Sequence, residues 1–105
     1  MKITMTGFAK QQIRKTTEYI FKEFGKDSKD DFINKLIQTK KLLESNPCLG
    51  PTEPLLSDLP SNYRSIVIGS LNKMIYRILD DCIEISDFWD VRRDPNTLAD
   101  QLKPQ

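Results

Sequence analysis

The residues with the most chemical potential lie near the C-terminal end of the chain, where two arginines follow an aromatic pair. Arg92 and Arg93 come shortly after Phe88-Trp89, with Asp90 between the two pairs. A guanidinium group can hold a phosphate or a carboxylate through two parallel hydrogen bonds. We therefore expect this segment to grip phosphates or a carboxylate of a partner. Asp90 and Asp94 flank these arginines, so the other interpretation is that the opposite charges neutralise one another.

Three more basic residues lie on predicted strands upstream. Arg77 is expected opposite Glu84, which is most simply a surface ion pair that contributes about 0–1 kcal/mol. Lys73 is expected to pack its aliphatic stem over the ring of Phe88. Arg64 begins its strand, and the four-residue turn at 69–72 leaves its face undetermined.

The composition excludes several kinds of site. The chain has no histidine and two cysteines, Cys48 and Cys82, whose spacing is not that of a metal site. We therefore expect no zinc, no other metal and no cofactor. No nucleophile–base pair is visible, so a general base near neutral pH would have to be Glu, Asp, Lys or Tyr with a displaced pKa.

Size and charge predict a single domain, residues 1–105, of an ordinary soluble protein. Sixteen basic and fifteen acidic residues nearly cancel, which gives nucleic-acid binding no support. No apolar run approaches the ~18 residues that a membrane helix needs. Without a signal peptide, we expect reduced cysteines and a cytoplasmic location, and no membrane partner.

The N-terminal half predicts a strand followed by two helices. Residues 2–5 alternate as a short strand does. A helix over 7–24 begins after Thr6 as N-cap and ends at Gly25. A second helix over 28–46 starts at a capping box headed by Ser28. Both helices carry an apolar stripe, so we expect an antiparallel hairpin that covers one face of a sheet. The stripes are expected to be core, and they include Phe24 and Phe32, with Tyr19 and Phe21 at the edge of the first.

A proline-rich connection over 47–61 leads to three antiparallel strands. We expect Leu55, Leu56 and Leu59 to pin this connection to the body. The strands are predicted over 63–68, 73–79 and 82–88, with Asp80-Asp81 as a two-residue hairpin loop. That loop predicts four cross-strand pairs: Leu79 with Cys82, Arg77 with Glu84, Ile75 with Ser86, and Lys73 with Phe88.

Cross-strand partners share a face, so the register also assigns the two faces of the sheet. One face, turned to the helices, carries five apolar side chains: Met74, Tyr76, Ile78, Ile83 and Ile85. The other is expected to be bare and to serve function, and it carries Lys73, Ile75, Arg77, Glu84, Ser86 and Phe88. Continued alternation adds Asp90 and Arg92 to this bare face.

The element order and the segment YRSIVIGSLNKMIYRILDDCIEISDFWDVRRDP (63–95) resemble the RelE/ParE toxins of bacterial type II toxin–antitoxin systems. In that family a Tyr-Arg pair begins a strand, a second strand bears Tyr, an acidic turn follows, and an Arg-containing tail often precedes Pro. The matching residues here are Tyr63-Arg64, Tyr76-Arg77, Asp80-Asp81 and Arg92-Arg93-Asp94-Pro95. The resemblance implies an α+β fold, in which an N-terminal strand and a two-helix hairpin accompany a four-stranded, mainly antiparallel sheet.

The resemblance implies one of two activities, together with a cognate antitoxin as partner. RelE-like members enter the ribosome and cut mRNA without a metal, and Arg64, Lys73 and Arg92 align with their basic residues. ParE-like members bind DNA gyrase and are not nucleases. A toxin homologue that is inactive and only binds antitoxin is a third interpretation.

Three departures from the nuclease pattern favour the gyrase-binding branch. The place where related nucleases have His is taken by Asp90 or Trp89, and no Tyr follows Arg92. The chain is nearly neutral, whereas those nucleases are strongly basic. Two helices of roughly nineteen residues also suit the ParE-like branch. We expect target contacts from five residues: Arg77, Phe88, Trp89, Asp90 and Arg93.

Overall fold

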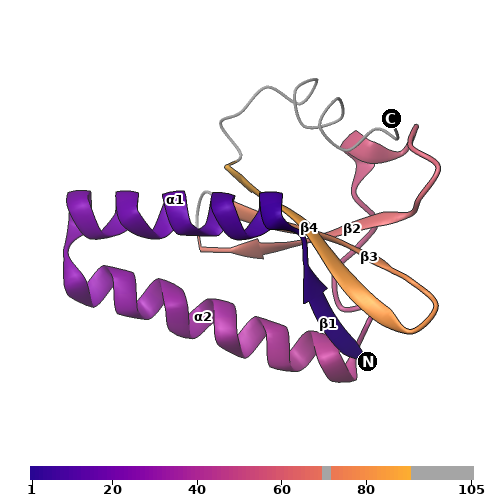
Figure 1. Cartoon of the computed structure of the whole chain (residues 1–105), viewed down its shortest axis with the longest axis horizontal. Coiled ribbons are helices and arrows are strands. Elements are labelled where there is room, and N and C mark those ends of the chain that lie inside the picture. Colours follow the sequence, from indigo (N-terminus) through magenta and orange to yellow (C-terminus); the bar gives the residue numbers. More distant parts are fainter. Residues whose placement is uncertain (70–71, 91–105) are drawn as a thin grey trace.

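A two-helix hairpin lies against a four-stranded sheet and extends beyond it in the computed structural model of the chain (Figure 1). The structure describes residues 1–69 and 72–90. The elements, in chain order, are β1 (Lys2–Met5), α1 (Gly7–Phe24), α2 (Lys26–Ser45), a short 3-10 turn η1 (Pro54–Leu56), β2 (Tyr63–Ile68), β3 (Asn72–Ile78) and β4 (Cys82–Asp90). None of the described helices is both long and apolar enough to cross a membrane.

The hairpin turns on a single glycine. α1 begins as expected, because the Thr6 side chain accepts a hydrogen bond from the Ala9 N–H at 3.0 Å. It ends at Gly25, whose φ of +91° is a backbone conformation that favours glycine. α2 then begins directly at Lys26, so the predicted start at Ser28 is wrong. One residue that both ends α1 and precedes α2 leaves no room for a separate capping box.

The sheet has the predicted fold class, α+β and mainly antiparallel. Its strand order is β1-β4-β3-β2. β1 pairs with β4 in parallel, whereas β4 with β3 and β3 with β2 pair antiparallel. The N-terminal strand therefore lies beside the last strand, at one edge of the sheet.

A bulge in β4 corrects part of the predicted register. The hairpin loop is as expected, because Leu79 N–H donates to Cys82 O at 2.8 Å and Arg77 faces Glu84. The register then shifts, and Ser86 has no partner across β3. Ile75 therefore faces Asp87 and not Ser86, and Lys73 faces Trp89 and not Phe88. A two-residue loop fixes the pairing only as far as the first bulge.

The bulge also reassigns faces. Phe88 pairs with Met74 and belongs to the cluster beneath the helices, together with Tyr76 and Ile85. Asp90 pairs with Asn72 and shares that helix side. Both were expected on the opposite face, and both are there because one extra residue reverses the alternation. Arg92 lies outside the described residues.

The second face of the sheet is covered, which contradicts the expectation of a bare surface. Leu56 packs there with Tyr63, Ile75 and Trp89, and Leu59 packs against this second cluster. Leu55 was also expected to pin the connection but is 41% exposed. The proline-rich connection therefore works as a cover, because the apolar residues of the second face need burial as much as those of the first.

Candidate functional site

The three basic residues aligned with nuclease positions do not form one site within the described chain. Arg64 pairs with Tyr76 across β2 and β3, which places it on the helix side of the sheet. Lys73 pairs with Val67 and Trp89, on the loop-covered side. The two side chains therefore leave the sheet in opposite directions. Arg92, the third, is outside the described residues.

Lys73 is engaged by a buried carboxylate. Its Nζ lies 3.1 Å from Glu53 Oε2, and the side chains are 26% and 1% exposed. Glu53 Oε2 also accepts a hydrogen bond from Ser65 Oγ at 2.6 Å, and its Oε1 accepts one from Leu55 N–H at 3.3 Å. The Lys73 ammonium also lies 5.7 Å from the centre of the Trp89 ring. This lysine therefore joins the proline-rich connection to the sheet.

Opposing effects act on the ionisation of Glu53. Burial favours the neutral acid and by itself would raise the pKa of the carboxyl. Hydrogen bonds from Ser65, Lys73 and the Leu55 N–H, together with the Lys73 charge, outweigh burial and hold the pKa of Glu53 below its ordinary value. Glu53 is thus a carboxylate at neutral pH. The sequence did not predict Glu53 as a buried residue, because no pattern in the residues around it indicates burial.

Tyr76 and Arg64 hold the start of the same connection from the helix side. The Tyr76 hydroxyl donates to Pro47 O at 2.8 Å and accepts from Gly50 N–H at 2.9 Å. Arg64 Nη1 donates to Gly50 O at 2.7 Å. Burial raises the pKa of the Tyr76 phenol, so it remains protonated and able to donate. The family-like Tyr and Arg positions therefore have a structural use here.

Arg77 makes the predicted ion pair and two further contacts. Its Nε donates to Glu84 Oε1 at 3.0 Å, and its Nη1 donates to Ser61 Oγ at 2.9 Å. The guanidinium carbon also lies 5.8 Å from the centre of the Tyr63 ring. The interpretation of Arg77 as part of a cross-strand ion pair is confirmed.

The other residues that were expected to contact the target differ in how far the fold buries them. Phe88 and Trp89 are each 2% exposed, so neither ring can touch a partner while the sheet keeps this packing. Asp90 is half-buried on the helix side, and Arg93 lies outside the described residues. Asp87, which was not singled out from the sequence, is fully buried, and its Oδ1 accepts a hydrogen bond from the Phe88 N–H at 2.7 Å.

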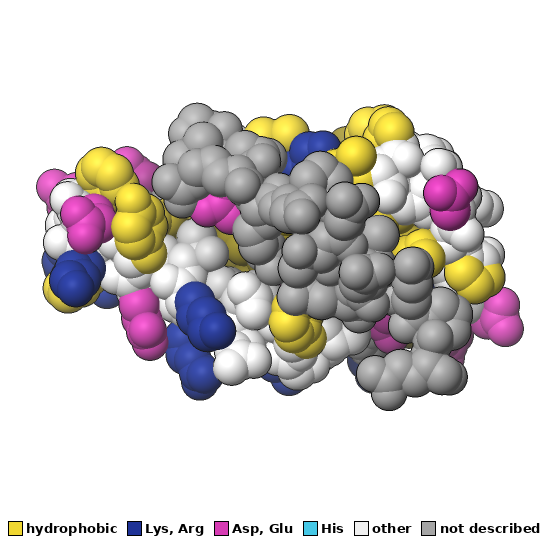
Figure 2. Space-filling model, turned by 90° about the horizontal axis from the view of Figure 1, so that it is seen from above, with side chains coloured by type: hydrophobic (Ala, Val, Ile, Leu, Met, Phe, Trp, Pro, Cys, Tyr) yellow, Lys and Arg dark blue, Asp and Glu magenta, His cyan; other side chains and the backbone are white. Residues whose placement is uncertain are grey.

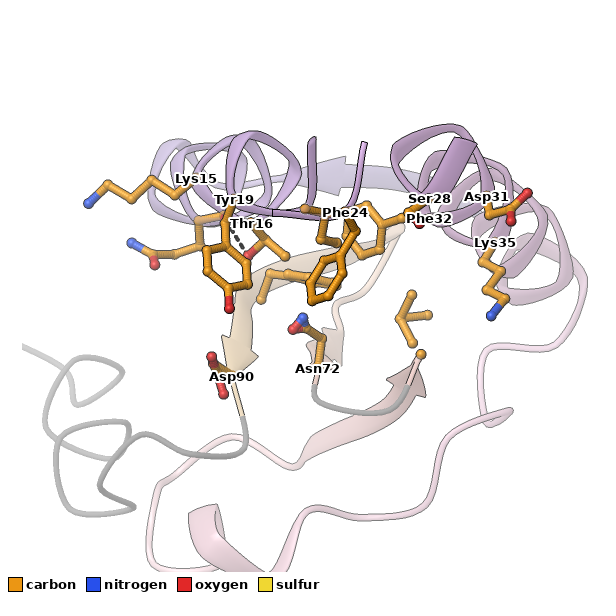
Figure 3. Close-up of a pocket in the computed structure, with 15 residues that line it drawn as sticks. Lys15, Thr16, Tyr19, Phe24, Ser28, Asp31, Phe32, Lys35, Asn72 and Asp90 are labelled. Carbon is orange, nitrogen blue, oxygen red and sulfur yellow. Dashed lines mark hydrogen bonds between the residues drawn. The ribbon is translucent and has the colours of Figure 1, made fainter. Parts of the chain in front are cut away.

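A groove of about 620 Å³ opens between the hairpin and one end of the sheet. Figure 3 shows Phe24 and Phe32 reaching into it from the helices, while Asn72 and Asp90 line its sheet side. The Tyr19 hydroxyl points toward these two polar residues, and Lys15 extends away from the cavity. An apolar floor with a few polar groups at one end is typical of a site for a protein segment or a ligand.

Exposed aromatic residues continue from this groove to the free end of the hairpin. Tyr19, Phe21 and Phe24 are 46%, 52% and 65% exposed. At 150–250 Å² for a whole ring, they present roughly 250–400 Å² of surface. Figure 2 shows hydrophobic side chains at this end, with acidic and basic side chains around them. Tyr19 and Phe24 meet edge-on at 6.3 Å between ring centres, whereas the Lys29 ammonium lies over the Phe21 ring, 4.9 Å from its centre.

The helical periodicity assigned these aromatics to the core, which is correct only near the sheet. Ile13 and Ile20 pack against the core, whereas Phe24 is the last residue of α1 and is largely exposed. A pattern of spacing finds the apolar side of a helix but does not show how much of its length is covered.

In the described ranges, 1–69 and 72–90, no group of three or more potential metal ligands occurs.

Comparison with known proteins gives the chain a family and a fold. The family described as "ParE toxin of type II toxin-antitoxin system, parDE" matches residues 3–95. A chain from the chromosomal ParDE toxin–antitoxin system of P. aeruginosa superposes with a TM-score of 0.70 at 16% identity, over 88% of this chain and 97% of that one. No curated protein sequence matches.

Two further structures share the fold. A YoeB/ParE toxin from Agrobacterium tumefaciens has a TM-score of 0.58 and 19% identity, over 86% of this chain and 98% of that one. A chain of the DinJ-YafQ complex of E. coli has a TM-score of 0.56 and 20% identity, over 85% and 91%. At these identities the likeness concerns architecture.

Proposed function

Because the chain belongs to the ParE toxin family of type II toxin–antitoxin systems, we propose that it arrests growth by binding DNA gyrase and does not cleave RNA. A cognate antitoxin holds it inactive. ParE and RelE toxins pair with such antitoxins, and the ParDE and DinJ-YafQ structures are named for such systems.

The observation that carries the proposal is the placement of Arg64 and Lys73. Metal-free RNA cleavage by a 2′-hydroxyl needs cations that converge on one phosphate, and an acid and a base to move protons. Arg64 donates to Gly50 O on one side of the sheet. Lys73 pairs with buried Glu53 on the other side. Neither cation is available to stabilise a phosphate that the other also contacts.

The exposed surface also suits a protein target better than RNA. Protein interfaces are enriched in aromatic side chains, whereas RNA binding draws on clustered basic charge. The hairpin offers Tyr19, Phe21 and Phe24. Its residues 15–35 include five lysines and five acidic residues, so this region has no excess of positive charge. We therefore propose the end of the hairpin as the surface that meets gyrase; Arg77 lies on the loop-covered face beside Tyr63 and belongs to a separate surface.

The decisive experiment is a supercoiling assay with purified gyrase and relaxed plasmid. We expect inhibition that rises with toxin concentration and is relieved by an equimolar amount of the antitoxin. A Phe21→Ser/Phe24→Ser variant should inhibit at least tenfold less well, because both rings are largely exposed. Full supercoiling at a large excess of folded toxin would remove gyrase as the target.

A second measurement separates the alternatives. Primer extension on mRNA from cells that express the toxin should show uncut transcripts during growth arrest. New cleavage sites that disappear with Lys73→Met would establish the nuclease instead. Normal growth with confirmed soluble toxin would identify an inactive homologue that retains only antitoxin binding.

A further inference from the structure

Positive charge is concentrated in one half of the helical hairpin. The halves of α1 and α2 that lie nearer the sheet (Figure 1), residues 8–17 and 32–43, carry six basic residues and no acidic one: Lys10, Arg14, Lys15, Lys35, Lys40 and Lys41. The end of the hairpin, residues 18–31, carries three lysines and five acidic residues. The near balance of charge over the whole chain therefore hides a basic region next to a mixed one.

The fold does not neutralise this basic region. Both salt bridges found among the described residues lie in the sheet and its proline-rich connection. Within the ranges 1–69 and 72–90, no acidic side chain therefore pairs with a cation of either helix. In residues 47–90 the acidic residues outnumber the basic ones by seven to three, and each of those three cations already has a partner. The cations that remain able to bind an external anion are those of the hairpin.

On two successive turns of α1, four exposed polar side chains form what we call the basic face: Lys10, Gln11, Arg14 and Lys15. Ala9 and Ile13, which alternate with them, pack into the core, so the basic face is the solvent side of the helix. Lys10 and Arg14 are one turn apart, about 6 Å along the axis. Lysine, arginine and glutamine all donate hydrogen bonds to phosphate oxygens. A row of such donors without a carboxylate suits the phosphate backbone of a nucleic acid.

We propose that the basic face contacts the phosphate backbone of the duplex DNA that gyrase holds, while the aromatic end of the hairpin contacts the gyrase protein. Arg14 and Phe21 are seven residues apart on one helix, roughly 10 Å along its axis, so a partner that presents protein beside DNA meets both surfaces at once. Gyrase acts on DNA and is such a partner. The choice of partner rests on the proposed function, whereas the phosphate contact can be measured without gyrase.

The salt dependence of DNA binding tests the phosphate contact. The probe is a fluorescently labelled DNA duplex, to which purified toxin is added while anisotropy is recorded at several concentrations of KCl. Each neutralised phosphate contributes about −0.9 to the slope of log affinity against log salt, so the three cations of the basic face predict a slope of about −3. Duplexes of unrelated sequence should bind equally, because phosphates carry no sequence information.

A matched pair of double variants locates the contact. Lys10→Gln/Arg14→Gln removes two charges from the basic face, and Lys22→Gln/Lys26→Gln removes two from the end of the hairpin. All four side chains are exposed, so both variants should unfold at temperatures close to that of the parent. The first should bind the duplex at least about fivefold more weakly and flatten the slope by about 2, and the second should change neither. Equal losses would show that net charge alone matters and would overturn the inference.

The affinity of the toxin for gyrase, measured with and without a stoichiometric linear duplex, tests the choice of partner. We expect at least about fivefold tighter binding to DNA-bound gyrase, because two linked contacts reinforce each other, and no such gain for Lys10→Gln/Arg14→Gln. The same gain in that variant would overturn the inference and leave gyrase as the target.

Two further results bear on the free toxin. No duplex binding at the lowest salt, or tighter binding of a single-stranded RNA of equal length, would overturn the inference, and the second would assign the basic face to RNA. Duplex binding with the expected slope but no inhibition of gyrase would remove gyrase as the target while the phosphate contact stands.

Discussion

At the scale of single residues, the neighbours of a charged side chain decide its use. Lys73 has the type and position expected of a phosphate-binding residue, yet the Glu53 carboxylate lies 3.1 Å from its ammonium group. Arg64 likewise donates to Gly50 O. Both cations fasten the proline-rich connection, so the residue type alone does not show what a cation binds.

The Glu53 interaction predicts a pH-dependent stability. Because the folded-state pKa of Glu53 is lowered, its carboxylate stabilises the fold fully above the unfolded value near 4.5. That contribution disappears as the pH falls below this value through the folded-state pKa. Glu53→Gln should therefore cost about 1–3 kcal/mol at pH 7 and progressively less in acid, measured by urea unfolding from about pH 7 to pH 3.

Glu84, the partly exposed acid that pairs with Arg77, provides the control. Glu84→Gln weakens the pair with Arg77 and should cost under about 1 kcal/mol. A Glu53→Gln variant that loses the same stability at every pH would contradict the assigned ionisation.

The Tyr76 hydroxyl gives a second prediction at this scale. Tyr76→Phe leaves Gly50 N–H and Pro47 O without their partner and should cost about 1–3 kcal/mol. Tyr19→Phe is the control, because Tyr19 is 46% exposed and should change the free energy of unfolding by under about 0.5 kcal/mol. Equal changes in thermal unfolding would show that the Tyr76 hydroxyl bonds contribute nothing.

At the scale of elements, periodicity and turn chemistry predicted the helices and strands to within a few residues. The Thr6 cap and the two-residue loop before Cys82 were correct because each depends on adjacent residues. The bulge at Ser86 was missed, since no glycine or proline marks it. The cover of the second face was missed because a loop carries no period, although Leu56 and Leu59 were rightly expected to anchor it.

The proline-rich connection predicts a steric test at Gly50. A Cβ on Gly50 would lie 2.4 Å from Ser65 O and 2.7 Å from Ile66 Cγ1, both closer than real contacts allow. Gly50→Ala should therefore displace the connection and cost about 1–3 kcal/mol, measured by chemical unfolding. Gly7→Ala, where nothing lies within 4 Å, should be neutral or slightly stabilising. Equal effects would show that the connection shifts freely.

At the scale of the whole molecule, the aromatic residues of the hairpin divide into a set for stability and a set for partners. Phe32 is 7% exposed and meets Phe88 edge-on at 5.6 Å between ring centres. Phe24, on the same hairpin, is 65% exposed. The sequence predicted both as core, because the fold, and not the local pattern, decides where the sheet ends beneath the helices.

This division predicts opposite consequences for two identical substitutions. Phe32→Ala should cost about 3–5 kcal/mol and weaken function only through unfolding. Phe24→Ala should change the free energy of unfolding by under about 1 kcal/mol and still reduce gyrase inhibition at least fivefold. Unfolding midpoints and the supercoiling assay on the same samples check both statements, and unaltered inhibition by Phe24→Ala would deny this ring a role in the gyrase contact.

The composition of the two apolar clusters depends on the number of residues in β4, because this strand contains one extra residue. Ser86 shifts the alternation by one step, so that Phe88 joins the cluster under the helices and Trp89 joins the cluster under the proline-rich connection. Deletion of Ser86 would remove this extra residue and shift the alternation of β4 by one position. Each side chain from Asp87 to Asp90 would move to the other face of the sheet, and the two apolar clusters, which share no residue, would lose their packing together.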